Sequence, residues 1–176
     1  MPAAPQGAFA AILPDVRGSV DVHNFLVERD VPHEVLPVAG RTRSAERLAA
    51  LLELPLEEVG KVVVFEGTAG GVAAVIPAGS TADVERVRKA TTRTDLEPAS
   101  DDRAAELTGY LAESMPPVGL PGEFTVVLDR ALARDSVLYF PGGEARAVLK
   151  IRGKDLARAT HAKVARIAGA GPPSSP

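Results

Sequence analysis

The sequence predicts a single mixed α/β domain of the α+β kind, with a mostly antiparallel sheet flanked by helices. Its 176 residues are enough for one domain with a sizeable core. Short apolar runs rich in valine are joined by tight turns that contain glycine, which favours hairpins over parallel crossovers. Segments with apolar residues at helical spacing separate these runs and predict the flanking helices.

The first half of the chain is predicted to alternate helices and strands. Ser19 is expected to cap a helix that Asp21 stabilises in its first turn and that Pro32 ends. The patterns that follow predict a strand over 33–38, a helix capped by Thr42, a helical turn over 55–59, strands over 62–65 and 72–76, and a turn over 67–71 between them. The apolar run at 62–65 is typical of a central strand that is covered on both faces.

The second half is predicted to be richer in strands and to end in a helix. Thr81 is expected to cap a helix that reaches Ala90, and Ser100 a helix over 101–107. The remaining patterns predict a short strand over 95–99, a loop over 108–122, strands over 124–128, 137–140 and 145–151, and a closing helix over 155–168. Residues 1–18 and 169–176 contain helix-breaking residues and no core pattern, so we expect tails there and a domain over 19–168.

The composition argues against several kinds of site and partner. The chain has no cysteine, which excludes disulfides, thiolate zinc sites and cysteine nucleophiles, and its three histidines lack metal-ligand spacing. We therefore expect no metal. A net charge of −3 argues against extensive binding to DNA, because such proteins usually carry a basic surplus. There is no signal-peptide pattern and no apolar run of about 20 residues, so we expect a cytoplasmic protein without membrane contact.

The most informative residue is Lys61, a charge at the start of the apolar strand 62–65. A lysine at this position either extends its side chain to the surface or projects it into a pocket. Its position alone favours the surface. In a pocket, the compact ammonium group could hold a phosphate or polarise a carbonyl.

A long loop and a basic segment are the other candidate sites. The stretch 108–119 has no regular pattern, and Gly109 and Gly119 would allow its N–H groups to approach an oxyanion closely. A plain surface connection is the equal alternative. A basic cluster lies in and after the helix that Thr81 is expected to cap; it either forms a solvated face or contacts RNA phosphates. Its members are Arg86, Arg88, Lys89 and Arg93.

Six segments of the chain occur in an order that is typical of one protein family. They are Glu58-Val59-Gly60-Lys61-Val62-Val63-Val64-Phe65, Ala73-Ala74-Val75-Ile76-Pro77, Thr108-Gly109-Tyr110-Leu111, Met115-Pro116-Pro117-Val118-Gly119, Val126-Val127-Leu128-Asp129 and the Gly142-Gly143 turn before a strand. The ordered set resembles the YbaK and prolyl-tRNA synthetase-associated domain family, the free-standing aminoacyl-tRNA deacylases. The resemblance covers residues 19–168 approximately.

This resemblance implies a fold, a reaction and partners. The fold is a barrel-like mixed sheet with flanking helices. The reaction is hydrolysis of the ester in a mischarged aminoacyl-tRNA, often alanine or cysteine on a proline tRNA, without a metal or organic cofactor. The partners implied are the acceptor end of aminoacyl-tRNA and an aminoacyl-tRNA synthetase. The lysine that matches Lys61 lies in the pocket, where it either stabilises the oxyanion or anchors the 3′-terminal nucleotide.

The resemblance also implies which residues surround the substrate. They are Gly109, Met115, Pro116, Pro117, Gly142, Gly143 and Val148. Members that act on cysteinyl-tRNA have two glycines where this chain has Glu113 and Ser114, and an aspartate where it has Val148. Alanine-specific members tend to have a polar residue where it has Val62. An apolar Val148 suits a small apolar aminoacyl group better than a charged one.

Two other functions are compatible with the same residues. A non-catalytic module that docks on tRNA or on a synthetase would have a closed pocket, or Lys61 in solvent, and would use the surface over 86–93. A small-molecule esterase is disfavoured, because the sequence shows neither a Gly-x-Ser-x-Gly elbow nor a nucleophile–base pair.

Overall fold

A computed structural model describes residues 16–169, and the elements below all lie within that range. The α-helices are α2 (Ser19–Glu28), α3 (Ala45–Leu52), α4 (Val84–Thr91), α5 (Asp101–Thr108) and α6 (Gly153–Thr160), and the 3₁₀ turns are η1 (Leu56–Glu58), η2 (Ala112–Ser114) and η3 (Arg130–Leu132). The strands are β1 (Glu34–Pro37), β2 (Gly60–Glu66), β3 (Val72–Pro77), β4 (Thr81–Ala82), β5 (Glu97–Pro98), β6 (Thr125–Asp129), β7 (Val137–Pro141), β8 (Ala147–Arg152), β9 (Lys163–Ala165) and β10 (Ala168–Gly169). Over the same residues, we find no helix with the length and apolar character that crossing a membrane requires.

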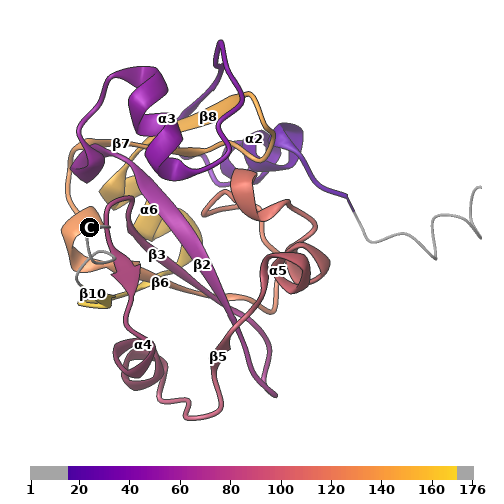
Figure 1. The fold of residues 1–176 in the computed structure, drawn as a ribbon, viewed down its shortest axis with the longest axis vertical. Coiled ribbons are helices and arrows are strands. Elements are labelled where there is room, and N and C mark those ends of the chain that lie inside the picture. Colours follow the sequence, from indigo (N-terminus) through magenta and orange to yellow (C-terminus); the bar gives the residue numbers. More distant parts are fainter. Residues whose placement is uncertain (1–15, 170–176) are drawn as a thin grey trace, which may run out of the picture.

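The strands form two main sheets and one small one (Figure 1). The larger sheet has the order β5-β2-β3-β6-β9, the second has the order β1-β8-β7, and β10 pairs with β4. The β3–β6 and β6–β9 ladders are parallel and the other ladders between these strands are antiparallel, so the fold is mixed α/β. The barrel-like closure is not confirmed, because the large sheet ends at β5 on one side and at β9 on the other.

Strand β2 is open along one edge near its start. It pairs with β3 from its first residue to Phe65, but with β5 only at its last two residues. Val62 and Val63 are only half-buried. The prediction of a central strand covered on both faces is therefore wrong for the first half of β2, and this open half holds Lys61.

Three apolar clusters hold the elements together. The largest lies between the two main sheets and includes Leu26 of α2, Val75 of β3 and Leu149 of β8. The second covers the opposite face of the large sheet, where α4 contributes Val87. The third packs Leu48 of α3 against the segment that leads into β2 and against β8. This third cluster fixes α3 close to the start of β2.

Three helix caps differ from the predicted ones. Helix α2 follows Gly18, whose N–H donates to the Asp21 carboxylate at 2.8 Å. Ser44 caps α3 and Asp83 caps α4, because these side chains reach the N–H group three residues further on. The predicted caps Ser19, Thr42 and Thr81 are therefore wrong, whereas the predicted cap at Ser100 is confirmed.

The predicted closing helix over 155–168 is wrong in its second half. Helix α6 ends at Thr160, where His161 takes a left-handed conformation with φ of 51°, and the chain then extends as β9 and β10. The buried carboxylate of Asp129 accepts the N–H groups of Ile167 and the next residue at 2.9 and 2.8 Å. Contacts distant in the sequence thus override the local helical pattern.

The predicted tails, 1–18 and 169–176, lie almost entirely outside the described residues. Inside the described range, Arg17 donates its main-chain N–H to Gly109 O at 2.9 Å, and Gly169 pairs with Thr81 in the small sheet. The predicted domain limits at residues 19 and 168 stay a prediction.

Candidate active site

Lys61 lines a cavity of about 280 Å³ between α3, the start of β2 and the loop after α5. Strand β2 contributes Lys61 and Val62 to its walls. The other lining residues come from the start of α3, the start of α5 and the neighbouring loops; they are Arg43, Ser44, Ala45, Glu46, Asp101, Ala112, Glu113, Met115 and Pro141. Charged and apolar side chains therefore face the same small space.

The start of α3 is fixed at the cavity by its cap. The Ser44 hydroxyl accepts the N–H of Arg47 at 3.0 Å, and Arg43 before it takes a left-handed conformation with φ of 55°. The first N–H groups of a helix have no partner within the helix, and they carry the positive end of its dipole. Two residues that carry such groups, Ala45 and Glu46, line the cavity.

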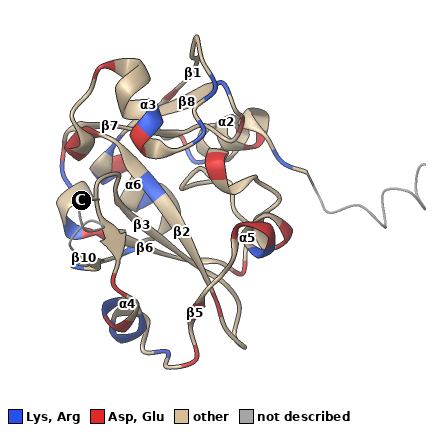
Figure 2. Cartoon of the chain, viewed as in Figure 1, with Lys and Arg blue, Asp and Glu red and all other residues tan. Residues whose placement is uncertain are grey.

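Lys61 and Glu46 form an ion pair inside this cavity. Lys61 Nζ donates to Glu46 Oε1 at 2.7 Å, and the exposed fractions of the two side chains are 26% and 46%. Figure 2 shows basic and acidic positions close together where α3 lies near the start of β2. An ammonium group has three N–H donors, so the bond to Glu46 leaves two for another acceptor in the cavity.

The loop after α5 is buried and is not a surface connection. Residues 114–119 are all buried. The Tyr110 hydroxyl donates to Gly119 O at 3.1 Å, and burial raises the pKa of this hydroxyl above its usual range. Gly143 donates its N–H to Ser114 O at 3.0 Å. These internal bonds make the loop a fixed wall of the cavity.

Met115 is the predicted substrate-binding position that lines the cavity. The predicted Gly142–Gly143 turn directly follows the lining residue Pro141 but does not itself line the cavity. The N–H of Gly142 is bonded within the turn, to Ala147 O at 2.9 Å. Both glycines therefore bond their N–H groups within the protein and offer neither to a substrate.

Six predicted positions do not line this cavity; they are Gly109, Pro116, Pro117, Gly142, Gly143 and Val148. Gly109 ends α5 with φ of 84°, and its N–H donates to Ala105 O at 2.9 Å, so it does not offer that group to an oxyanion. The two prolines are buried within the loop. Val148 packs in the third apolar cluster and is paired in register with the lining residue Pro141 on the neighbouring strand.

The basic residues in and after α4 lie away from Lys61 and are largely bonded within the chain. Helix α4 lies at the opposite end of the molecule from α3 (Figure 1). Arg86 donates to Ala168 O at 3.0 Å, and Arg93 donates to Gly70 O at 2.8 Å with only 17% of its side chain exposed. Lys89 is exposed. The fold thus uses both arginines for its own contacts.

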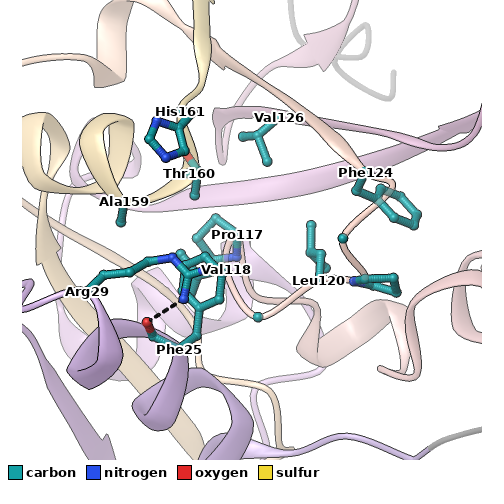
Figure 3. Close-up of a pocket in the computed structure, with 13 residues that line it drawn as sticks. Phe25, Arg29, Pro117, Val118, Leu120, Phe124, Val126, Ala159, Thr160 and His161 are labelled. Carbon is teal, nitrogen blue, oxygen red and sulfur yellow. Dashed lines mark hydrogen bonds between the residues drawn. The ribbon is translucent and has the colours of Figure 1, made fainter.

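A second cavity, of about 180 Å³, lies further along the same loop (Figure 3). Its walls include the apolar residues Phe25, Val118 and Phe124, together with Arg29 and His161. The Arg29 guanidinium lies 3.6 Å from the centre of the Phe25 ring and donates to Phe25 O at 3.0 Å. None of the described residues that line this cavity is acidic, so the ion pair of the first cavity has no counterpart here.

The sequence patterns did not indicate the acidic side of the cavity. Glu46, Asp101 and Glu113 all line it, and Glu113 is paired with Arg41 at 2.5 Å. Glu46 and Asp101 follow capping serines, where acidic residues are common for local reasons. Only the fold shows that these helix starts face Lys61. Among the described residues, no group of three or more His, Asp and Glu is placed to hold a metal ion.

Known proteins share this architecture. The family model of the aminoacyl-tRNA editing domain matches residues 39–159. No curated protein sequence matches the chain. The crystal structure of hypothetical protein APE2540 is similar over 85% of this chain and 99% of that chain, with a TM-score of 0.79 and 29% identity. The structure of "a putative trans-editing enzyme for prolyl tRNA synthetase" shares the fold over 86% of this chain and 96% of that chain, with a TM-score of 0.75 and 24% identity.

Proposed function

The chain belongs to the aminoacyl-tRNA editing domain family, and from this premise we propose that it removes the amino acid from mischarged tRNA by ester hydrolysis in the Lys61 cavity. One observation carries the proposal. Lys61 lines an open cavity and is held there by Glu46 at 2.7 Å. The family match over 39–159 includes α3, β2 and the buried loop, which together form the walls of the cavity.

The chemistry requires little from the protein because an aminoacyl ester is already activated. A positioned water adds to the carbonyl carbon, and the bond from this carbon to the ribose oxygen breaks. The ribose oxygen takes up a proton from the water and becomes the 3′-terminal hydroxyl, and the free amino acid leaves. The protein has to place the ester and stabilise the oxyanion that forms. The two N–H donors of Lys61 that Glu46 does not use supply this stabilisation, and the positive end of the α3 dipole adds to it.

We propose that the aminoacyl group is small and apolar, with alanine on a proline tRNA as the first candidate and cysteine as the second. Val62, Met115 and Pro141 give the cavity an apolar side, and Val148, where cysteine-specific relatives have an aspartate, is paired in register with Pro141. The name of one similar structure refers to prolyl tRNA synthetase, which supports the choice of tRNA. Equal turnover of alanyl and aspartyl esters would remove the support for an apolar substrate.

The geometry favours an enzyme over a binding module or an esterase with its own nucleophile. A binding module would have a closed cavity or Lys61 in solvent and would use the surface over 86–93. Instead, the cavity is open, Lys61 is paired with Glu46 with 26% of its side chain exposed, and Arg86 and Arg93 bond within the chain. Among the described residues that line the cavity, Ser44 is the only one with a hydroxyl group, and this group accepts the N–H of Arg47. No histidine lies beside it, so attack by water is the better-supported route.

A panel of mischarged tRNAs tests this function. We expect the wild type to release the amino acid from at least one member, with the alanine-charged proline tRNA fastest. Lys61→Ala should reduce this rate by about 100- to 1000-fold, the usual effect of removing one oxyanion donor. Lys150→Ala is the matched control, because Lys150 also lies on a strand and is paired, with Glu34 at 3.8 Å, but lies outside the cavity.

Two results would contradict the proposal. If the wild type released no amino acid from any member of the panel, the enzyme assignment would be wrong. If Lys61→Ala and Lys150→Ala behaved alike, hydrolysis would not depend on the Lys61 cavity.

A further inference from the structure

Two histidine rings meet at the surface between α2 and β1, outside the Lys61 cavity. His23 lies in α2, and His33 lies directly before β1. His23 Nδ1 and His33 Nε2 are 2.9 Å apart, and the ring centres are 5.0 Å apart with the planes inclined by 54°. His23 is exposed and His33 is half-buried, so the pair lies at the surface of the molecule.

The hydrogen bond on the far side of His33 fixes which of its nitrogens is free. Its Nδ1 lies 2.8 Å from Val31 O, and a carbonyl oxygen only accepts, so in the neutral ring Nδ1 carries the hydrogen. Nε2 therefore presents a lone pair towards His23. Histidines that ligate metals are usually held in this way, with the other ring N–H bonded to a carbonyl or a carboxylate.

We propose that His23 and His33 chelate a divalent transition-metal ion, with water completing its coordination. Neutral His23 can take the tautomer in which Nδ1 also presents a lone pair, so the two rings offer one nitrogen each. No third protein ligand is needed, and none is grouped with the pair in the described part of the chain. The metal would connect α2 to β1.

The separation of the two nitrogens indicates which metals fit. At metal–nitrogen distances of about 2.0–2.1 Å, two ligands at a right angle are about 2.9 Å apart, whereas two at the tetrahedral angle are about 3.3 Å apart. The pair is hydrogen-bonded at 2.9 Å without metal, so a right-angle site needs the rings to turn with little change in the separation of the two nitrogens. Tetragonal sites of this kind suit Cu²⁺ and Ni²⁺, and Cu²⁺ binds nitrogen ligands most tightly in the series. The expected order of affinity is therefore Cu²⁺ above Ni²⁺, with Zn²⁺ weakest.

Calorimetric titration of the full chain without an affinity tag, with each metal chloride alone, tests the site. We expect one saturable Cu²⁺ site per chain and an electron paramagnetic resonance spectrum with nitrogen couplings. His33→Ala and His23→Gln should each lower the affinity for Cu²⁺ by about tenfold or more, since even the loss of a residue that only supports a metal ligand lowers metal affinity by this much. His161→Ala removes the third histidine of the chain and is the matched control, with unchanged binding.

The variant His23→Gln separates a metal site from a structural hydrogen bond. Glutamine can still donate an N–H to His33 Nε2, so without metal the thermal midpoint should stay close to that of the wild type. With Ni²⁺, the midpoint should rise in the wild type and not in the variant, because a ligand that binds only the folded state stabilises it. Three results would each overturn the proposal. They are Cu²⁺ binding by both variants that is as tight as in the wild type, the absence of a saturable site in the wild type, and tighter binding of Zn²⁺ than of Ni²⁺.

Discussion

Replacing Asp129 tests how the end of the domain is held, and the size of the effect follows from its contacts. Asp129 is 3% exposed; its carboxylate accepts the N–H of Ala131 at 2.9 Å and those of Ile167 and Ala168 at 2.9 and 2.8 Å. A hydrogen bond to a charged group contributes about 1.5–3 kcal/mol. The bond from Ile167 is buried and the other two are partly exposed, so we count the first in full and the others at about half. Asp129→Ala should then lower the free energy of unfolding by about 3–6 kcal/mol.

Urea unfolding followed by circular dichroism measures this difference. Asp129→Asn keeps one acceptor oxygen, so its cost should be about half as large. Asp135→Ala is the matched control: the Asp135 side chain is 62% exposed and lies 3.5 Å from Arg152, so removing it should cost less than about 1 kcal/mol. A cost below about 1 kcal/mol for Asp129→Ala would refute the view that this carboxylate anchors β9 and β10.

Three further predictions concern the cavity and the large sheet. Glu46→Gln should change the free energy of unfolding by less than about 1 kcal/mol, because the pair is partly exposed. The variant keeps an acceptor oxygen but loses the charge, so it should hold Lys61 less firmly and lower the deacylation rate; both assays are run on one preparation. Gly60→Ala places a Cβ 2.1 Å from the buried Phe140 ring, so it should cost about 1–3 kcal/mol in urea unfolding and also reduce activity. Hydrogen bonds from the Thr68 main chain and side chain lower the pKa of Asp95 below 3.8, so their stabilisation is present above about pH 4 and is lost as the pH falls through the folded-state pKa. Asp95→Asn should therefore lower the thermal midpoint at neutral pH, and its difference from the wild type should shrink as the pH is lowered.

Local patterns were sufficient for most strands and insufficient for features set by distant contacts. The apolar runs of β2, β3, β6 and β7 were predicted close to their observed limits, because their residues pack wherever the sheet forms. The helical spacing after Thr160 was misleading, because Asp129 binds that segment from another part of the chain. The predicted cap at Thr42 was wrong because Ser44, two residues later, reaches the free N–H group.

The candidate site, too, could be predicted only in part from local patterns. Lys61 could be singled out because a charge stands at the start of an apolar strand, although its position alone favoured the surface. The ordered matches to a family predicted a pocket instead. In the structure, Lys61 lies in the wall of a cavity. Glu46 gave no such signal, since an acidic residue in a first helical turn is common. Its contact with Lys61 depends on how α3 packs on the segment before β2, which no local pattern specifies.

Single-turnover hydrolysis of an alanine-charged proline tRNA by an excess of enzyme tests the central claim most directly. Wild type and Lys61→Ala are compared over a range of enzyme concentrations, so that the rate constant of the chemical step is separated from the affinity for the tRNA. If Lys61 stabilises the oxyanion, the rate constant at saturation should fall by about 100- to 1000-fold with little change in affinity. An unchanged rate constant at saturation, with or without a loss of affinity, would contradict the account.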